Sequence, residues 1–121
     1  MKNLLSVAHY GMNTYEDATK ESIALFGRNN FDYPKPEMLI SVLLGAVTNK
    51  GDLVLDSFLG SGTTAAVAQK MGRRYIGVEL GQHAYTHCYP RLKMVTDGTD
   101  QGGISKAQNW KGGNGFKFYE L

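Results

Sequence analysis

A glycine-rich turn between two short apolar runs constrains the fold of this chain more than any other feature. Residues 53–55 predict a buried strand, and Gly60 and Gly62 then allow a tight turn that brings backbone amides close to a ligand. Residues 63–71 favour a helix, and the apolar run that follows it ends in Glu79. The pattern predicts one β-α-β unit with a glycine loop at the N-terminus of its helix, where ligand anions are well placed.

The loop alone leaves the identity of the ligand open. The sequence from Gly60 to Ala65 fits the dinucleotide pattern G-x-G-x-x-G/A, and no lysine follows the glycines, which excludes a P-loop. Glu79 lies 19 residues after Gly60 (79 − 60), a spacing that suits an acid accepting hydrogen bonds from ribose hydroxyls. Since NAD, FAD and S-adenosylmethionine all carry that ribose, Glu79 does not choose between them.

Asp56, at the carboxyl end of the first strand, does separate these cofactors. A carboxylate there would repel a pyrophosphate, by roughly 4 kcal/mol for two unit charges about 4 Å apart at an effective dielectric of 20. The ammonium and sulfonium groups of S-adenosylmethionine would be attracted instead. The charge pattern therefore favours S-adenosylmethionine and disfavours the alternative of a nicotinamide dehydrogenase domain.

Composition narrows the class of protein further. The chain has 121 residues, of which 42% are hydrophobic, which fits one domain with a modest core. Its net charge of +2 is too small to indicate nucleic acid binding by itself. Cys88 is the single cysteine, so no internal disulfide can form and a reducing compartment is favoured. With no membrane-length apolar run and no signal peptide, we expect a cytoplasmic protein without membrane association.

The elements before the loop are a leading segment and two helices. Residues 1–30 predict a leading segment with a helix that begins after Thr14. Pro36 can serve as the first residue of a helix over 36–48, whose apolar stripe would pack on the sheet. We expect residues 31–121 to form the cofactor-binding core, so that the chain is a single, partial domain.

The elements after the loop are a divided helix, a loop and a strand. Residues 81–95 predict a helix that Pro90 kinks or divides near Tyr89. Residues 99–115 are typical of a loop, and the alternation over 116–121 predicts a C-terminal third strand. His83 and His87 could share one helix face, but they lack a third ligand, so no metal site is predicted.

With these pieces in place, the chain resembles the amino-group DNA methyltransferases, especially the modification subunits of type III restriction–modification systems. The resemblance runs from about Asn13 to Leu121. It is carried, in the family's order, by Asn13-Thr14…Thr19-Lys20-Glu21, Phe31-Asp32-Tyr33-Pro34-Lys35-Pro36, Asp56-Ser57-Phe58-Leu59-Gly60-Ser61-Gly62-Thr63-Thr64, and Gly112 to Leu121. It implies part of a Rossmann-like, S-adenosylmethionine-dependent methyltransferase fold, in which a doubly wound sheet carries helices on both faces.

The resemblance also implies a cofactor site made of the matched positions. The glycine loop would hold the methyl donor, with Asp56 and Ser61 near its methionine end and the Lys35–Pro36 segment closing that side. Glu79 would hold the ribose, and Leu80 would lie beside the adenine. The expected cofactor-binding residues are Lys35, Pro36, Asp56, Phe58, Gly60, Ser61, Gly62, Thr63, Glu79 and Leu80.

One departure from the family pattern concerns catalysis. The family's active site needs Asp/Asn-Pro-Pro-Tyr/Phe, whose polar groups accept hydrogen bonds from the target amine and whose ring stacks on a flipped-out base. The prolines of this chain stand at positions 34, 36 and 90, so the motif is absent. The resemblance therefore implies the C-terminal, cofactor-binding portion of an enzyme that methylates adenine N6 in double-stranded DNA. This portion would have no catalytic residues of its own and would be inactive alone.

Two alternatives and two kinds of partner stay open. The target could be cytosine N4, or the chain could be a non-catalytic remnant that binds cofactor or a partner chain. A type III modification subunit would have a restriction subunit as partner. An exposed sheet edge would also favour a homodimer or other self-association.

Overall fold

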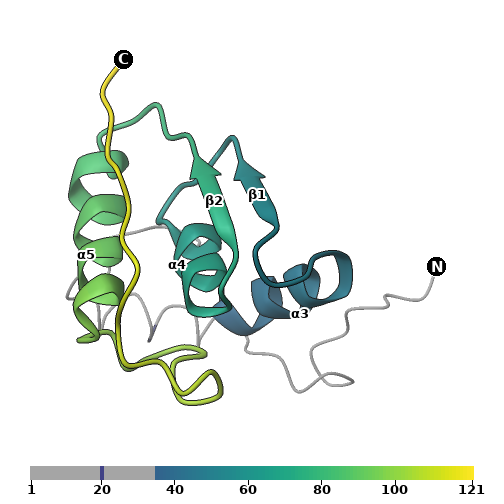
Figure 1. The fold of residues 1–121 in the computed structure, drawn as a ribbon. Helices are drawn as coiled ribbons and strands as arrows, with labels where there is room; N and C mark the ends of the chain where they lie inside the picture. Colours follow the sequence, from purple (N-terminus) through teal and green to yellow (C-terminus); the bar gives the residue numbers. More distant parts are fainter. Residues whose placement is uncertain (1–19, 21–34) are drawn as a thin grey trace.

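The computed structural model describes residue 20 and residues 35–121 (Figure 1). Apart from residue 20, the predictions for residues 1–34 lie outside the described part. The elements in order are α3 (Glu37–Val47), β1 (Leu53–Asp56), α4 (Thr63–Lys70), β2 (Arg74–Gly77), the π-helix η1 (Ala84–Cys88) and α5 (Tyr89–Asp97).

The two strands form the parallel pair that the glycine turn predicted. Val54 lies opposite Tyr75, and Asp56 lies opposite Gly77. Because α4 connects the strands, β1, α4 and β2 form one β-α-β unit, and the α/β fold class is confirmed. The carboxyl ends of both strands meet at one edge, which is where open parallel sheets bind ligands.

Local chemistry explains where the helices begin and end. Pro36, with φ −70°, immediately precedes α3, which ends one residue before Thr48, close to the predicted range of 36–48. Gly62 precedes α4 in the left-handed region at φ +90°, and Gly72 follows its end at φ +77°. Both glycines therefore stand where a residue with a side chain would be strained.

Helix α4 is the centre of the core. Its residues from Ala65 to Lys70 are all buried, and the small side chains of its alanines let neighbouring elements approach closely. Val67 packs with Leu44 from α3 and Val54 from β1. The opposite face of the sheet is different, because Leu55 and Ile76 are 64% and 52% exposed. In the described part, the covered face of the sheet is therefore the one that α4 contacts.

The helical region after β2 is divided as Pro90 predicted. The π-helix η1 changes to the α-helix α5 at Tyr89, and Pro90 lies in the first turn of α5, where its missing N–H costs no hydrogen bond. Gly98 caps α5 in the left-handed region at φ +79°. None of the described helices combines the length and apolar character that crossing a bilayer would require.

The prediction of a strand over 116–121 is wrong, because within residues 35–121 this segment pairs with no strand. Aromatic contacts hold it against the divided helix instead: Phe118 lies against Tyr85 and Tyr89 with ring centroids 5.3 and 5.4 Å apart, and Phe116 lies 5.6 Å from Tyr89. Figure 1 shows the segment running beside α5. The alternation that suggested a strand therefore reflects ring packing on a helix.

Candidate functional site

The glycine loop turns at the carboxyl end of β1. Gly60 and Gly62 both have positive φ, at +61° and +90°, and the turn closes with a hydrogen bond of 3.1 Å from the Gly62 amide to the Leu59 carbonyl. A Cβ at Gly62 would lie 3.4 Å from the Cys88 backbone, so glycine also lets η1 approach the loop. The loop is therefore fixed by its backbone geometry and by the close packing of η1 against it.

Glu79 is joined directly to this loop. One carboxylate oxygen accepts a hydrogen bond of 2.8 Å from the Gly60 amide, and the other accepts one of 2.8 Å from the Gly81 amide. The two residues that the sequence paired by spacing are thus in contact. A carboxylate has about four lone-pair positions, so both oxygens retain acceptor capacity for ligand hydroxyls.

Asp56 and Glu79 both make the surroundings of the loop negative. Asp56 ends β1, is half-buried and accepts a hydrogen bond of 3.0 Å from the Phe58 amide. Burial, and after it the charge of Glu79, raises the pKa of the Cys88 thiol to about 11, with Asp56 acting in the same direction and Arg91 against it. The thiol donates to the Gly60 carbonyl at 3.0 Å, so it lies in direct contact with the loop.

The Lys35–Pro36 segment touches the start of α4. The Thr63 hydroxyl donates to the Lys35 carbonyl at 3.1 Å, and Thr63 lies 3.2 Å from the Ser61 hydroxyl. Pro36 is buried, whereas the Lys35 side chain is exposed. The structure thus brings this segment to the loop through its backbone.

Two expected site residues are not enclosed by the described part of the chain. Phe58 is 90% exposed and Leu80 is 101% exposed. Phe58 follows β1 and Leu80 follows β2, so both lie beyond the carboxyl ends of the strands, on the side of the glycine loop.

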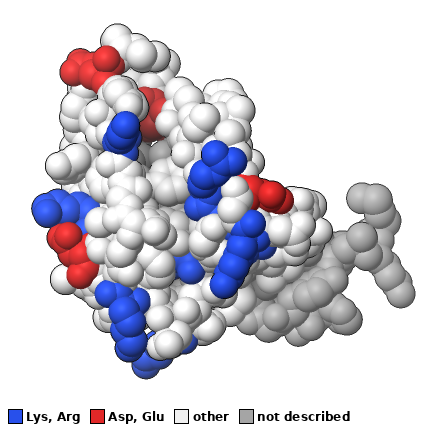
Figure 2. Space-filling view, in the orientation of Figure 1, with Lys and Arg blue, Asp and Glu red and all other residues white. Residues whose placement is uncertain are grey.

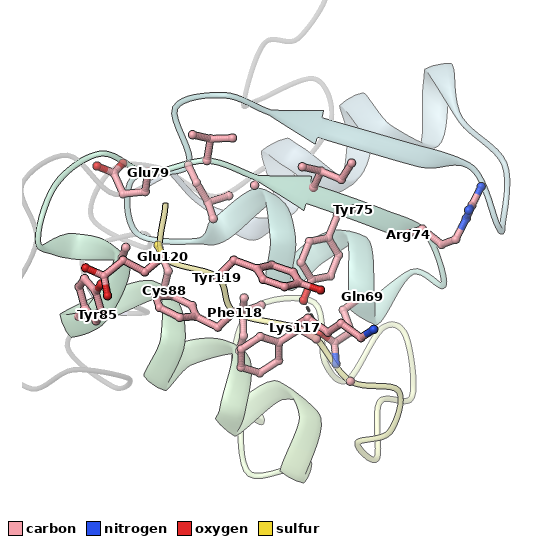
Figure 3. Close-up of a pocket in the computed structure, with 18 of the residues that line it drawn as sticks. Gln69, Arg74, Tyr75, Glu79, Tyr85, Cys88, Lys117, Phe118, Tyr119 and Glu120 are labelled. Carbon is pink, nitrogen blue, oxygen red and sulfur yellow. Dashed lines mark hydrogen bonds between the residues drawn. The ribbon is translucent and has the colours of Figure 1, made fainter.

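Sequence reasoning missed a groove between β2 and the C-terminal segment, because it expected a strand there. The groove has a volume of about 1320 Å³ and runs from Arg74 along β2 to Glu79 and Leu80, with residues 114–121 on its other side. Figure 3 shows Glu79 at one end, with Gln69 and Arg74 towards the other. Tyr75 donates to Gln69 at 3.0 Å, and burial raises the pKa of Tyr75 to about 12.

Sequence reasoning also missed a buried group of four charged side chains. Lys70 contacts Glu37 and Asp100 at 2.8 Å each, and Arg91 contacts Glu37 at 2.7 Å. No local pattern distinguishes Lys70 and Arg91 from exposed helix cations, so the sequence held no signal for this group; their burial is a finding of the structure.

Other chemistry is sparse in the described part. Residues 35–121 hold no group of three or more metal-ligating side chains, and the His83 and His87 rings pack edge to face at 5.3 Å. Figure 2 shows Lys and Arg side chains spread over one face of the molecule, with acidic side chains among them.

Comparisons with known proteins give a consistent picture. The family model described as DNA methylase matches residues 6–89. The chain is 55% identical over 87 residues to a probable type III restriction-modification enzyme HindVI Mod subunit of Haemophilus influenzae, a match that covers 72% of this chain and 12% of the relative.

Two further curated relatives are type II methyltransferases. M1.MboII of Moraxella bovis is 55% identical over 47 residues, covering 39% of this chain and 18% of the relative. M2.DpnII of Streptococcus pneumoniae is 51% identical over 63 residues, covering 52% and 24%. The crystal structure of M1.HpyAVI aligns with a TM-score of 0.45 at 28% identity, covering 57% of this chain and 41% of that one. The matches thus span at most a quarter of the curated relatives' lengths.

Proposed function

The chain belongs to the DNA methylase family, and we propose that it forms the donor-binding portion of an enzyme that moves a methyl group from S-adenosylmethionine to adenine N6 in double-stranded DNA. The observation that carries the proposal is the joining of Glu79 to the Gly60 amide at the end of β2, with Asp56 ending the neighbouring strand. Family membership supports use of this donor in general, and the loop supports its place in this chain.

The electrostatics of the loop favour a positively charged donor over a dinucleotide. Burial is the main reason that the pKa of the Cys88 thiol is raised. The charges of Glu79 and Asp56 add to it, so these carboxylates oppose the gain of negative charge beside the loop. A pyrophosphate would meet the same opposition, whereas ammonium and sulfonium groups would be stabilised. The residues present therefore fit S-adenosylmethionine.

Each expected residue has a role in this proposal. Glu79 would accept hydrogen bonds from the ribose hydroxyls, and Leu80 would contact the adenine. Asp56, Ser61 and the Lys35–Pro36 segment would face the methionine end. The loop and its flanks would supply the remaining contacts, from Phe58, Gly60, Gly62 and Thr63. When bound, the donor would supply a methyl group already activated by its positive sulfur.

We propose that acceptor chemistry requires residues other than those of this sequence, which contains no Asp-Pro-Pro-Tyr motif. The purified chain should therefore bind donor without methylating DNA. By analogy with the type III relative, a restriction subunit is the proposed partner of the whole protein. The exposed Leu55 and Ile76 further support self-association of this chain, and we propose a cytoplasmic location.

Titration calorimetry with S-adenosylhomocysteine, the demethylated product, tests this proposal. We expect binding to one site and no transfer of tritium from labelled donor to DNA. Absence of heat at high micromolar ligand would refute the donor site. Labelling of DNA by the purified chain would refute the assignment of acceptor chemistry to other residues.

A further inference from the structure

We infer that the buried ion pairs around Glu37 are a positioning device for the donor site: they hold the Lys35–Pro36 segment against the glycine loop and so keep the methionine end of the site in shape. The inference rests on the proposed function, since it concerns the same site. It assigns a role to three residues outside the expected cofactor contacts, namely Glu37, Lys70 and Arg91.

The ion pairs join three helices within the core. Lys70 of α4 donates to both oxygens of Glu37, at 2.8 and 3.1 Å, and to Asp100 at 2.8 Å. Arg91 of α5 donates to Glu37 at 2.7 Å. The side chains are 0–3% exposed. Because Glu37 is the first residue of α3, these contacts fix the start of α3 against both other helices.

The charges of this group compensate one another. Among the described residues, two cations face two carboxylates, and the Ile104 amide also donates to Glu37 at 3.1 Å. Burial by itself would raise the pKa of Glu37, but the charges of Arg91 and Lys70 and their hydrogen bonds outweigh it and hold that pKa below its usual value. Glu37 is therefore ionised at neutral pH and holds both cations.

The link from this group to the loop runs through Arg91 and Thr63. One terminal nitrogen of Arg91 binds Glu37, and the other donates to the Thr63 hydroxyl at 2.9 Å. The Thr63 hydroxyl in turn donates its single hydrogen bond to the Lys35 carbonyl at 3.1 Å. The planar guanidinium thus spans the ion group and the first residue of α4 in one fixed geometry.

The direction of these hydrogen bonds also determines what Ser61 offers a ligand. Because the Thr63 proton is used on the Lys35 carbonyl, the Ser61 hydroxyl is the donor in its 3.2 Å contact with Thr63. The Ser61 oxygen is then left as an acceptor only. An acceptor suits the ammonium group of a methionine moiety, so the ion group prepares this end of the site.

Stability alone does not account for this arrangement. Buried ion pairs are often replaced by apolar residues of similar volume without loss of stability, because desolvation offsets their attraction. Among the residues that the structure describes, the buried Nε atom of Arg91 has no hydrogen-bond partner, which is unfavourable. This arrangement instead fixes the orientation of the Arg91 guanidinium at the Thr63 hydroxyl.

The test compares two ligands that differ at the methionine end. S-adenosylhomocysteine carries the amino acid, whereas 5′-methylthioadenosine keeps the adenosine and lacks it. Glu37→Gln removes the charge that orients Arg91, and Arg91→Lys keeps a charge beside Glu37 but cannot bridge Glu37 and Thr63. We expect each variant to weaken the binding of S-adenosylhomocysteine roughly tenfold, which corresponds to the loss of one charge-assisted hydrogen bond. The binding of methylthioadenosine should weaken less than about twofold.

The matched control is Asp97→Asn, which breaks the exposed pair with Lys93 at 3.3 Å. It should change neither affinity. Equal weakening of both ligands by the core variants would mean a purely structural role, and no weakening of either would mean no link; both results overturn the inference. If Glu37→Gln does not fold, Arg91→Lys, whose folding is checked by its melting temperature, decides the matter.

Amide hydrogen exchange of the ligand-free chain separates failure of this inference from failure of the proposed function. Glu37→Gln should speed exchange at residues 60–64 while leaving β2 unchanged. If the wild-type chain binds neither ligand but shows this exchange pattern, the proposed function fails and the structural link stands. Unchanged exchange at residues 60–64 overturns the link itself.

Discussion

Replacing Glu79 by glutamine should loosen the glycine loop and weaken ligand binding together. The carboxylate accepts from the Gly60 and Gly81 amides at 2.8 Å each. Glutamine keeps one acceptor oxygen but presents an NH₂ group to the other amide, so one of the two bonds is lost. Hydrogen bonds to charged groups contribute about 1.5–3 kcal/mol. Since Glu79 is half-buried, we expect a loss below that range, about 1 kcal/mol.

This loss corresponds to a fall in melting temperature of roughly 4 °C for a domain of this size. Loss of a ribose acceptor should weaken 5′-methylthioadenosine roughly tenfold. Thermal unfolding and titration calorimetry measure the two effects, with Asp97→Asn as the exposed carboxylate control. A Glu79→Gln variant that melts and binds like the wild type would refute the reasoning that Glu79 holds both the loop and the ribose.

Three further predictions concern charge and protonation. Asp56→Asn should weaken S-adenosylmethionine several-fold and lessen the exclusion of NADH, as measured by calorimetry and nucleotide fluorescence; unchanged selectivity would contradict the electrostatic argument. Burial raises the pKa of Cys88 to about 11 in the folded chain, so the unfolded chain loses this proton first. The free energy of unfolding should therefore decline as pH rises from about 9 to 11. Cys88→Ala should reduce this decline, as measured by urea titrations. The pKa of Glu37 is lowered from 4.5, so the stability it contributes is present above pH 4.5 and should be lost as pH falls through its lower folded value; an unchanged acid-unfolding profile in Glu37→Gln would contradict this.

Much of the central unit could be predicted from sequence because its signals are local. The apolar runs, Gly62 and Gly72 define β1, α4 and their boundaries through backbone geometry. Pro90 likewise marks the change from η1 to α5, since proline cannot donate the hydrogen bond of a helix interior. The spacing of Gly60 and Glu79 predicted a ribose-binding acid beside the loop, and that role stays a prediction; the hydrogen bond between the two residues was not predicted.

The remaining features depend on contacts between distant residues, and local patterns do not determine these. Alternation over 116–121 is equally compatible with a strand and with rings packed on Tyr85 and Tyr89, and the second arrangement is the one found. The Glu37–Lys70 contact spans 33 residues, and Glu37–Arg91 spans 54. A helix that buries a lysine looks in sequence like one that exposes it, so the ion group became visible only once the helices were placed.

We propose that the acidic surroundings of the glycine loop select a positively charged methyl donor. The most direct measurement is calorimetric titration of the wild-type chain with S-adenosylmethionine and with NADH, each at low and high salt. We expect one-site binding of S-adenosylmethionine that weakens as salt screens the two carboxylates, and no heat with NADH. Tighter binding of NADH, or absence of S-adenosylmethionine binding at either salt concentration, would contradict it.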